Sequence, residues 1–149
     1  MSNAFRTAIA ATPDVAGHWQ IGLRALGANS SRVALADTSK CNGSLDIDTA
    51  LTPVQRNANR WDYALMYDGR VVYLEVHPAA SGANINEMIA KVRWLQNWLT
   101  TRATALRALP TRYPFIWVAS GKTNLLPSGA QRTALADAGL KPISHLRLG

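Results

Sequence analysis

The chain has 149 residues, a hydrophobic fraction of 48%, a charged fraction of 17% and a formal net charge of +7. This composition is that of an ordinary globular protein and excludes a disordered or fibrous one, and the length suits a single domain over residues 1–149. No apolar run approaches the roughly 20 residues needed to cross a bilayer, and the amino terminus lacks a signal-peptide pattern, so we expect a cytoplasmic protein.

The positive charge is carried by twelve arginines and four lysines. Because a planar guanidinium pairs well with phosphate, this ratio is typical of a protein with a polyanionic partner. The same ratio would arise if all proteins of the source proteome were rich in arginine. Charge alone therefore leaves both interpretations open.

The first half of the chain predicts one helix and two strands. Residues 14–26 carry apolar side chains at helical spacing and predict a helix that ends at a glycine. A polar, glycine-containing stretch follows, with a short strand at 32–36. Alternating apolar residues then predict a strand over 44–50, which would carry Asp46 and Asp48.

Residues 60–77 give the clearest pattern, two β-rich runs separated by Asp68-Gly69. This dipeptide tolerates positive φ and therefore suits a two-residue hairpin turn. In such a hairpin Tyr67 faces Arg70, which fixes the register of all the residue pairs behind it.

The second half predicts helices alternating with strands. Residues 84–109 show a long apolar helical face ended by a proline, and 113–119 predict a buried strand. Residues 128–138 predict another helix, and 143–148 a last short strand. Helices must therefore cover a mixed sheet in an α/β protein.

The hairpin register places Asp62 directly opposite Glu75, with their β-carbons about 4.5 to 5.5 Å apart. Two carboxylates at this distance repel each other unless they are neutralised, and a divalent cation such as Mg²⁺ or Mn²⁺ would neutralise them. Because side chains alternate along a strand, His77 lies on the face of Glu75, and the opposite face is predicted to be apolar. A solvated strand face, or neutralisation by Arg60 and other arginines, is the alternative.

Asp62, followed after twelve residues by Glu75-Val76-His77 at a strand end and then by a long helix and another strand, resembles the PD-(D/E)xK nuclease superfamily. The resemblance covers roughly residues 15–119. It implies an αβββαβ restriction-endonuclease-like core, with a mixed central sheet flanked by helices. It also implies hydrolysis of phosphodiester bonds, in DNA by analogy, with Mg²⁺ or Mn²⁺ bound by the two carboxylates.

The sequence departs from the family at two positions, since no proline precedes Asp62 and His77 stands where the family has its lysine. A histidine can orient or deprotonate water near neutral pH, but it lacks a permanent positive charge. Some members carry the lysine on the next helix, and Lys91 is the candidate for that role here. Asp48, or Asp46 beside it, is the candidate for a third metal ligand.

Structural roles compete with these assignments. His77 precedes a proline at a strand end and could simply cap the local backbone. Glu87 lies four residues before Lys91, in the favoured orientation for a helix-surface ion pair. Asn84 and Glu87 also resemble a capping box at the start of the helix. Trp94 and Trp98 lie at helical spacing on that helix, and both are expected to pack within the protein rather than to stack on bases.

Arg60 and Lys122 are the candidate contacts to nucleic acid. Lys122 follows a strand, but the glycine spacing of a phosphate loop is missing around it, and Cys41 lacks the surroundings of a catalytic or zinc-bound cysteine. The sequence therefore predicts a metal-dependent nuclease-like protein. The first alternative is a catalytically inactive domain of the same fold that binds nucleic acid or protein. The second is a purely structural or partner-binding α/β domain.

Overall fold

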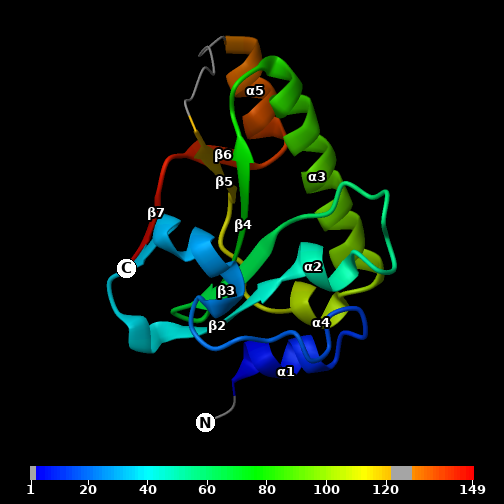
Figure 1. Cartoon of the computed structure of the whole chain (residues 1–149), viewed down its shortest axis with the longest axis vertical. Coiled ribbons are helices and arrows are strands. Elements are labelled where there is room, and N and C mark those ends of the chain that lie inside the picture. Colours follow the sequence, from blue (N-terminus) through cyan, green and yellow to red (C-terminus); the bar gives the residue numbers. More distant parts are fainter. Residues whose placement is uncertain (1–2, 122–128) are drawn as a thin grey trace.

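The computed structural model describes residues 3–121 and 129–149, and its centre is a five-stranded mixed sheet (Figure 1). In spatial order the strands are β2 (Cys41–Asp46), β3 (Tyr63–Tyr67), β4 (Arg70–Pro78), β5 (Phe115–Ser120) and β6 (Leu140–Ile143). Neighbours from β2 to β4 are antiparallel, and neighbours from β4 to β6 are parallel. The prediction of an α/β protein with a mixed sheet is confirmed.

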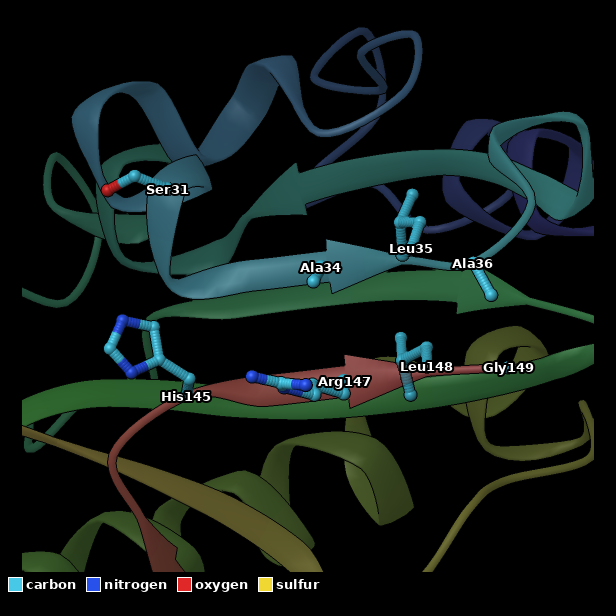
Figure 2. Close-up of a pocket in the computed structure, with 8 residues that line it drawn as sticks. All are labelled: Ser31, Ala34, Leu35, Ala36, His145, Arg147, Leu148 and Gly149. Carbon is cyan, nitrogen blue, oxygen red and sulfur yellow. The ribbon is translucent and has the colours of Figure 1, made fainter.

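Helices cover one face of this sheet and a second small sheet covers the other. The helices are α1 (Ala4–Ala10), α2 (Ile47–Leu51), α3 (Gly82–Thr101), α4 (Thr104–Arg107) and α5 (Gly129–Asp137). On the other face lie the 3₁₀ segment η1 (Arg24–Arg32) and the parallel strands β1 (Val33–Leu35) and β7 (Leu146–Leu148), which run side by side in Figure 2. A 3₁₀ turn, η2 (Thr38–Lys40), joins β1 to β2.

Strand β4 is buried on both of its faces. Val72 and Leu74 pack toward β1 and β7, whereas Val71 and Tyr73 pack toward the helices. The prediction that the face opposite Glu75 is apolar is confirmed, and the face of Glu75 is apolar as well, except near the end of the strand. The sequence of a strand that is covered on both faces is a continuous run of apolar residues, because neither face contacts water.

The predicted hairpin is confirmed in its turn and in its register. Tyr67 pairs with Arg70 across the turn. Asp68 and Gly69 adopt φ values of 49° and 79°, the left-handed conformation that a tight two-residue turn requires.

The helix predicted over residues 14–26 is wrong. The chain forms turns there, because Gly17 and Gly22 take φ values of 87° and 51° and break the helical path. The first helix is α1, and the Asn3 side chain accepts a hydrogen bond from the backbone N–H of Arg6 at its start.

The strand predicted over residues 44–50 is only half correct. Strand β2 ends at Asp46, whose carboxylate accepts hydrogen bonds from the backbone N–H of Thr49 at 2.9 Å and from its hydroxyl at 2.8 Å. This side chain caps α2, so Asp48 lies on a short helix rather than on a strand.

The long helix is confirmed, with corrected ends. It begins at Gly82, where Asn84 accepts hydrogen bonds from two backbone N–H groups ahead of the helix, and it stops at Thr101 before the separate α4. The last predicted strand over 143–148 is two strands, β6 and β7, that belong to different sheets. In the part of the chain that the structure describes, no helix is long and apolar enough to cross a membrane.

Candidate functional site

The candidate site lies where β3 and β4 separate. Their regular pairing ends at Tyr63 and Leu74. Beyond that pair, hydrogen bonds from backbone to side chain take the place of those between the two backbones. The backbone N–H of Asp62 donates to Oε2 of Glu75 at 2.7 Å, and the N–H of Val76 donates to Oδ2 of Asp62 at 3.1 Å. The two carboxylates are therefore neighbours, as the hairpin register predicted, and each is fixed to the other residue's strand.

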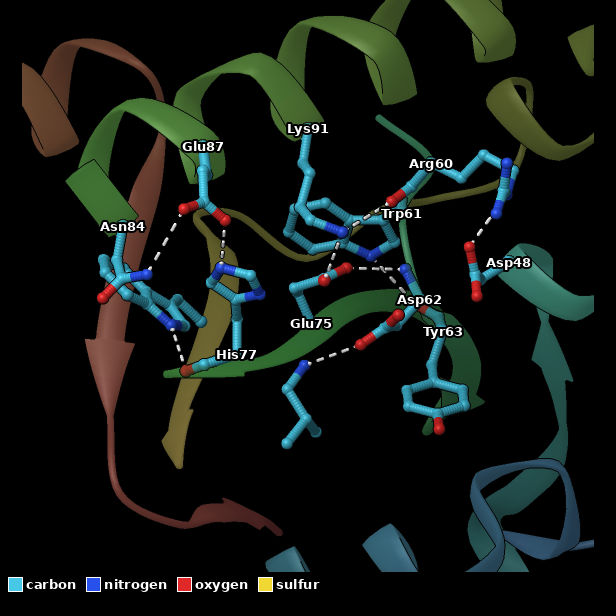
Figure 3. Close-up of polar contacts among 12 residues, drawn as sticks. Asp48, Arg60, Trp61, Asp62, Tyr63, Glu75, His77, Asn84, Glu87 and Lys91 are labelled. Atoms are coloured by element: carbon cyan, nitrogen blue, oxygen red, sulfur yellow. Dashed lines mark hydrogen bonds and ion pairs between the residues drawn. The ribbon is translucent and has the colours of Figure 1, made fainter. Parts of the chain in front are cut away.

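Lys91 joins this pair from α3, and Figure 3 shows its side chain directed at Glu75. The ammonium nitrogen lies 2.8 Å from Oε1 of Glu75 and donates to the backbone carbonyl of Arg60 at 3.0 Å. The alternative ion pair between Glu87 and Lys91 is absent, because Glu87 binds His77 instead. The structure therefore brings together Asp62, Glu75 and Lys91.

Burial dominates the electrostatics of this site. Glu75 is 1% exposed. Desolvation, together with the nearby charge of Asp62, raises the pKa of Glu75 to about 8, although Lys91 acts in the opposite direction. Burial also raises the pKa of Asp62, against the hydrogen bond from Val76. One buried and one partly buried carboxylate beside one lysine carry an excess of negative charge, which a proton or a cation can neutralise.

Asp48 is turned toward Arg60 and not toward this pair. The guanidinium Nε of Arg60 donates to Oδ1 of Asp48 at 2.8 Å, and a second guanidinium nitrogen binds the carbonyl of Gln55. Within residues 3–121 and 129–149, no cluster of three or more His, Cys, Asp or Glu side chains could hold a metal ion. Asp48 as a third ligand, and Arg60 as a contact to nucleic acid, stay predictions.

His77 is held by the first turns of α3. Its Nε2 lies 2.8 Å from Oε2 of Glu87, and its backbone carbonyl accepts a hydrogen bond from the indole of Trp117. The imidazole therefore has a carboxylate partner and does not cap the local backbone. Sequence analysis missed Glu87 in this role, because the contact depends on how α3 packs across the end of β4.

Two further predictions concern Lys122 and the helix tryptophans. Lys122 lies outside the described residues. Trp98 is 1% exposed, and Trp94 stacks against it with ring centroids 5.8 Å apart. The prediction that both pack within the protein is confirmed: Trp98 belongs to the core, and the partly buried Trp94 packs against it and donates a hydrogen bond to the side chain of Gln55.

Comparison of the chain with models of known protein families, with curated proteins and with solved structures finds no match.

Proposed function

We propose that this chain is a metal-dependent phosphodiesterase of the PD-(D/E)xK type that acts on nucleic acid, with DNA as its substrate. The observation that carries the proposal is the convergence of Asp62, Glu75 and Lys91 at the point where β3 and β4 separate. An aspartate, a glutamate and a lysine are the three residue types that the family uses. Here the lysine comes from the helix after the glutamate strand.

The arrangement of elements supports this proposal independently of the side chains. In chain order α1, β2, β3, β4, α3 and β5 give the αβββαβ sequence of the family's core, and the four strands are neighbours in the same order in the sheet. Additional short elements interrupt this order: η1, β1 and η2 between α1 and β2, α2 between β2 and β3, and α4 between α3 and β5. Fold alone does not define an activity, so the side chains must decide it.

Asp62 and Glu75 fit a magnesium or manganese ion. These ions prefer carboxylate oxygens and keep several waters, so two protein carboxylates are an adequate contribution. The raised pKa of Glu75 agrees with this. A carboxylate in a site with too little positive charge binds a proton, and a metal cation can replace that proton. When bound, such an ion lowers the pKa of a water and polarises a phosphoryl oxygen.

Lys91 and His77 would have different tasks. The Lys91 ammonium is fixed by Glu75 and by the carbonyl of Arg60, so it presents a positive charge where negative charge develops on a phosphoryl group. His77, held through Nε2 by Glu87, has its second ring nitrogen available to orient a water molecule.

The proposal is tested by calorimetric titration of MnCl₂ into the purified protein, followed by a plasmid-nicking assay on the same samples. We expect binding and nicking in the wild type, loss of both in Glu75→Gln, and loss of nicking with retained binding in Lys91→Met. Asp137→Asn and Lys141→Met are the matched controls, because both side chains are exposed and lie on α5 and β6.

The outcomes separate the nuclease from its alternatives. Absence of manganese binding would remove the metal site. DNA binding that survives in Glu75→Gln, without cleavage by the wild type, would favour an inactive nucleic-acid-binding domain of the same fold. Loss of nicking in the control variants would show that the assay reports general damage to the protein.

A further inference from the structure

The outer face of the small β1–β7 sheet is basic and hollowed. Along β7 the leucines face the core and Arg147 faces outward, paired in register with Ala34 of β1. Ser31, Ala34 and Ala36 are too small to fill the space beside them. They leave a hollow of about 380 Å³ that is also lined by His145 and Arg147, as Figure 2 shows.

A second hollow adjoins the first at the end of β7. It has a volume of about 440 Å³ and is lined by Arg70 and Arg112, and it shares Leu148 and Gly149 with the first. Arg112 is fixed to the sheet, because its backbone N–H donates to the carbonyl of Val71 at 2.8 Å. The two hollows therefore meet at Leu148 and Gly149, and together they form a strip from the outer face of β7 to the start of β4.

The net charge of this strip is positive. Arg70, Arg112 and Arg147 make no ion pair within the described part of the chain, whereas Arg60 and Arg102 each pair with an aspartate. Among the residues that line the two hollows, the acidic side chain is Asp68. We call the strip formed by Arg70, Arg112, His145 and Arg147 the β7 surface.

We propose that the β7 surface binds the sugar-phosphate backbone of a nucleic acid. Guanidinium groups pair with phosphate oxygens through parallel hydrogen bonds, and here three of them are exposed and have no carboxylate partner among residues 3–121 and 129–149. From residue 145 to residue 149 an extended chain covers about 13 Å. Measured along the helix axis, one strand of B-form DNA presents about four phosphates over that length.

This surface recognises charge and not base sequence. The hollows are lined by arginine and histidine together with small and aliphatic side chains, and the tyrosine among them, Tyr67, is 6% exposed and therefore presents no open ring face on which an unpaired base could stack. Tyr113, which is 69% exposed, follows Arg112 but packs against Phe115, on the helical face of the sheet. The choice of nucleic acid as partner rests on the proposed function, but binding at the β7 surface needs neither a metal nor Glu75.

The test is the affinity for fluorescein-labelled 20-mer DNA, single-stranded and duplex, measured by anisotropy in EDTA across a series of salt concentrations. The variant carries Arg70→Gln, Arg112→Gln and Arg147→Gln. Its control carries three equal charge changes on exposed arginines of α3, α4 and α5, which cover the opposite face of the sheet: Arg93→Gln, Arg107→Gln and Arg132→Gln. Thermal unfolding of both variants checks that they fold.

For the β7 variant we expect at least tenfold weaker binding near 0.1 M salt, and a slope of log affinity against log salt that is smaller by about 2 to 3 for duplex DNA. The control should keep the wild-type affinity and slope. Equal weakening in the control, or no weakening in the β7 variant, would overturn the proposal, as would binding to vesicles of anionic phospholipid in place of DNA.

Because Glu75→Gln is assayed beside them, failure of the metal site and failure of the β7 surface give different results. If Glu75→Gln neither binds manganese nor nicks DNA but binds DNA like the wild type, while the β7 variant binds DNA more weakly, the β7 surface is supported and the metal site fails. If the β7 variant binds manganese normally and DNA as tightly as the wild type, the surface is rejected and the metal site stands.

Discussion

The buried carboxylate of Glu75 should make the stability of this fold depend on pH. The ordinary pKa of a glutamate is near 4.5, and burial together with the charge of Asp62 raises that of Glu75 to about 8. The folded state therefore holds a proton on Glu75 between pH 4.5 and 8, where the unfolded chain has released it. Stability from this group is fully present below pH 4.5 and is lost as the pH rises through 8.

The size of the effect follows from the shift in pKa. Each pKa unit corresponds to about 1.4 kcal/mol, so a shift of this size corresponds to roughly 4 to 5 kcal/mol as an upper limit. Glu75→Gln removes the titration, while the amide oxygen can still accept the N–H of Asp62. The slope against pH therefore isolates the proton of Glu75.

The measurement is urea unfolding of wild type and Glu75→Gln at half-unit steps from pH 5 to pH 8.5. Across this range the free energy of unfolding of the wild type should fall by a few kcal/mol relative to Glu75→Gln. Asp137→Asn, which removes an exposed carboxylate, should run parallel to the wild type. Parallel curves for wild type and Glu75→Gln would show that Glu75 is ionised throughout and refute the reasoning.

Two further predictions concern packing. Tyr73 is fully buried and its hydroxyl has no hydrogen-bond partner among the described residues, so Tyr73→Phe should raise the free energy of unfolding by about 1 to 2 kcal/mol; a decrease would reveal a bound partner. Gly43 has a φ of 113°, and a β-carbon there would lie 2.1 Å from Nε1 of Trp19, so Gly43→Ala should cost about 3 kcal/mol or more. Gly22 has a φ of 51° and open space around it, so in the same urea assay Gly22→Ala should lower the free energy of unfolding by about 1 to 2 kcal/mol. Equal losses of stability in the two variants would contradict the steric explanation.

Residues close together in the sequence determined the central hairpin of the sheet and the pairing of the two carboxylates in the candidate site. The Asp68-Gly69 dipeptide and its flanking apolar runs fix the hairpin, because only one register suits a two-residue turn. That register alone makes Asp62 and Glu75 neighbours, and the structure has the same pairing at the turn. Residues close in sequence gave this result without any knowledge of the remaining fold.

Local patterns failed where glycine or capping competes with periodicity. The apolar spacing of residues 14–26 is helical, yet Gly17 and Gly22 adopt positive φ and the segment forms turns. Asp46 ends β2 because its carboxylate caps α2. In these segments a backbone preference or one hydrogen bond outweighs an apolar pattern, which is a weak signal over a short stretch.

The contacts of Lys91, Glu87 and Asp48 were decided by tertiary structure. Lys91 could pair with Glu87 on its own helix, but the packing of α3 on the sheet turns it to the buried Glu75 and leaves Glu87 to His77. Asp48 is directed at Arg60 because α2 sets its position. Side chains on one strand pair are placed by the spacing of the backbone, whereas the partner of a long side chain depends on which elements pack together and how deeply they bury it.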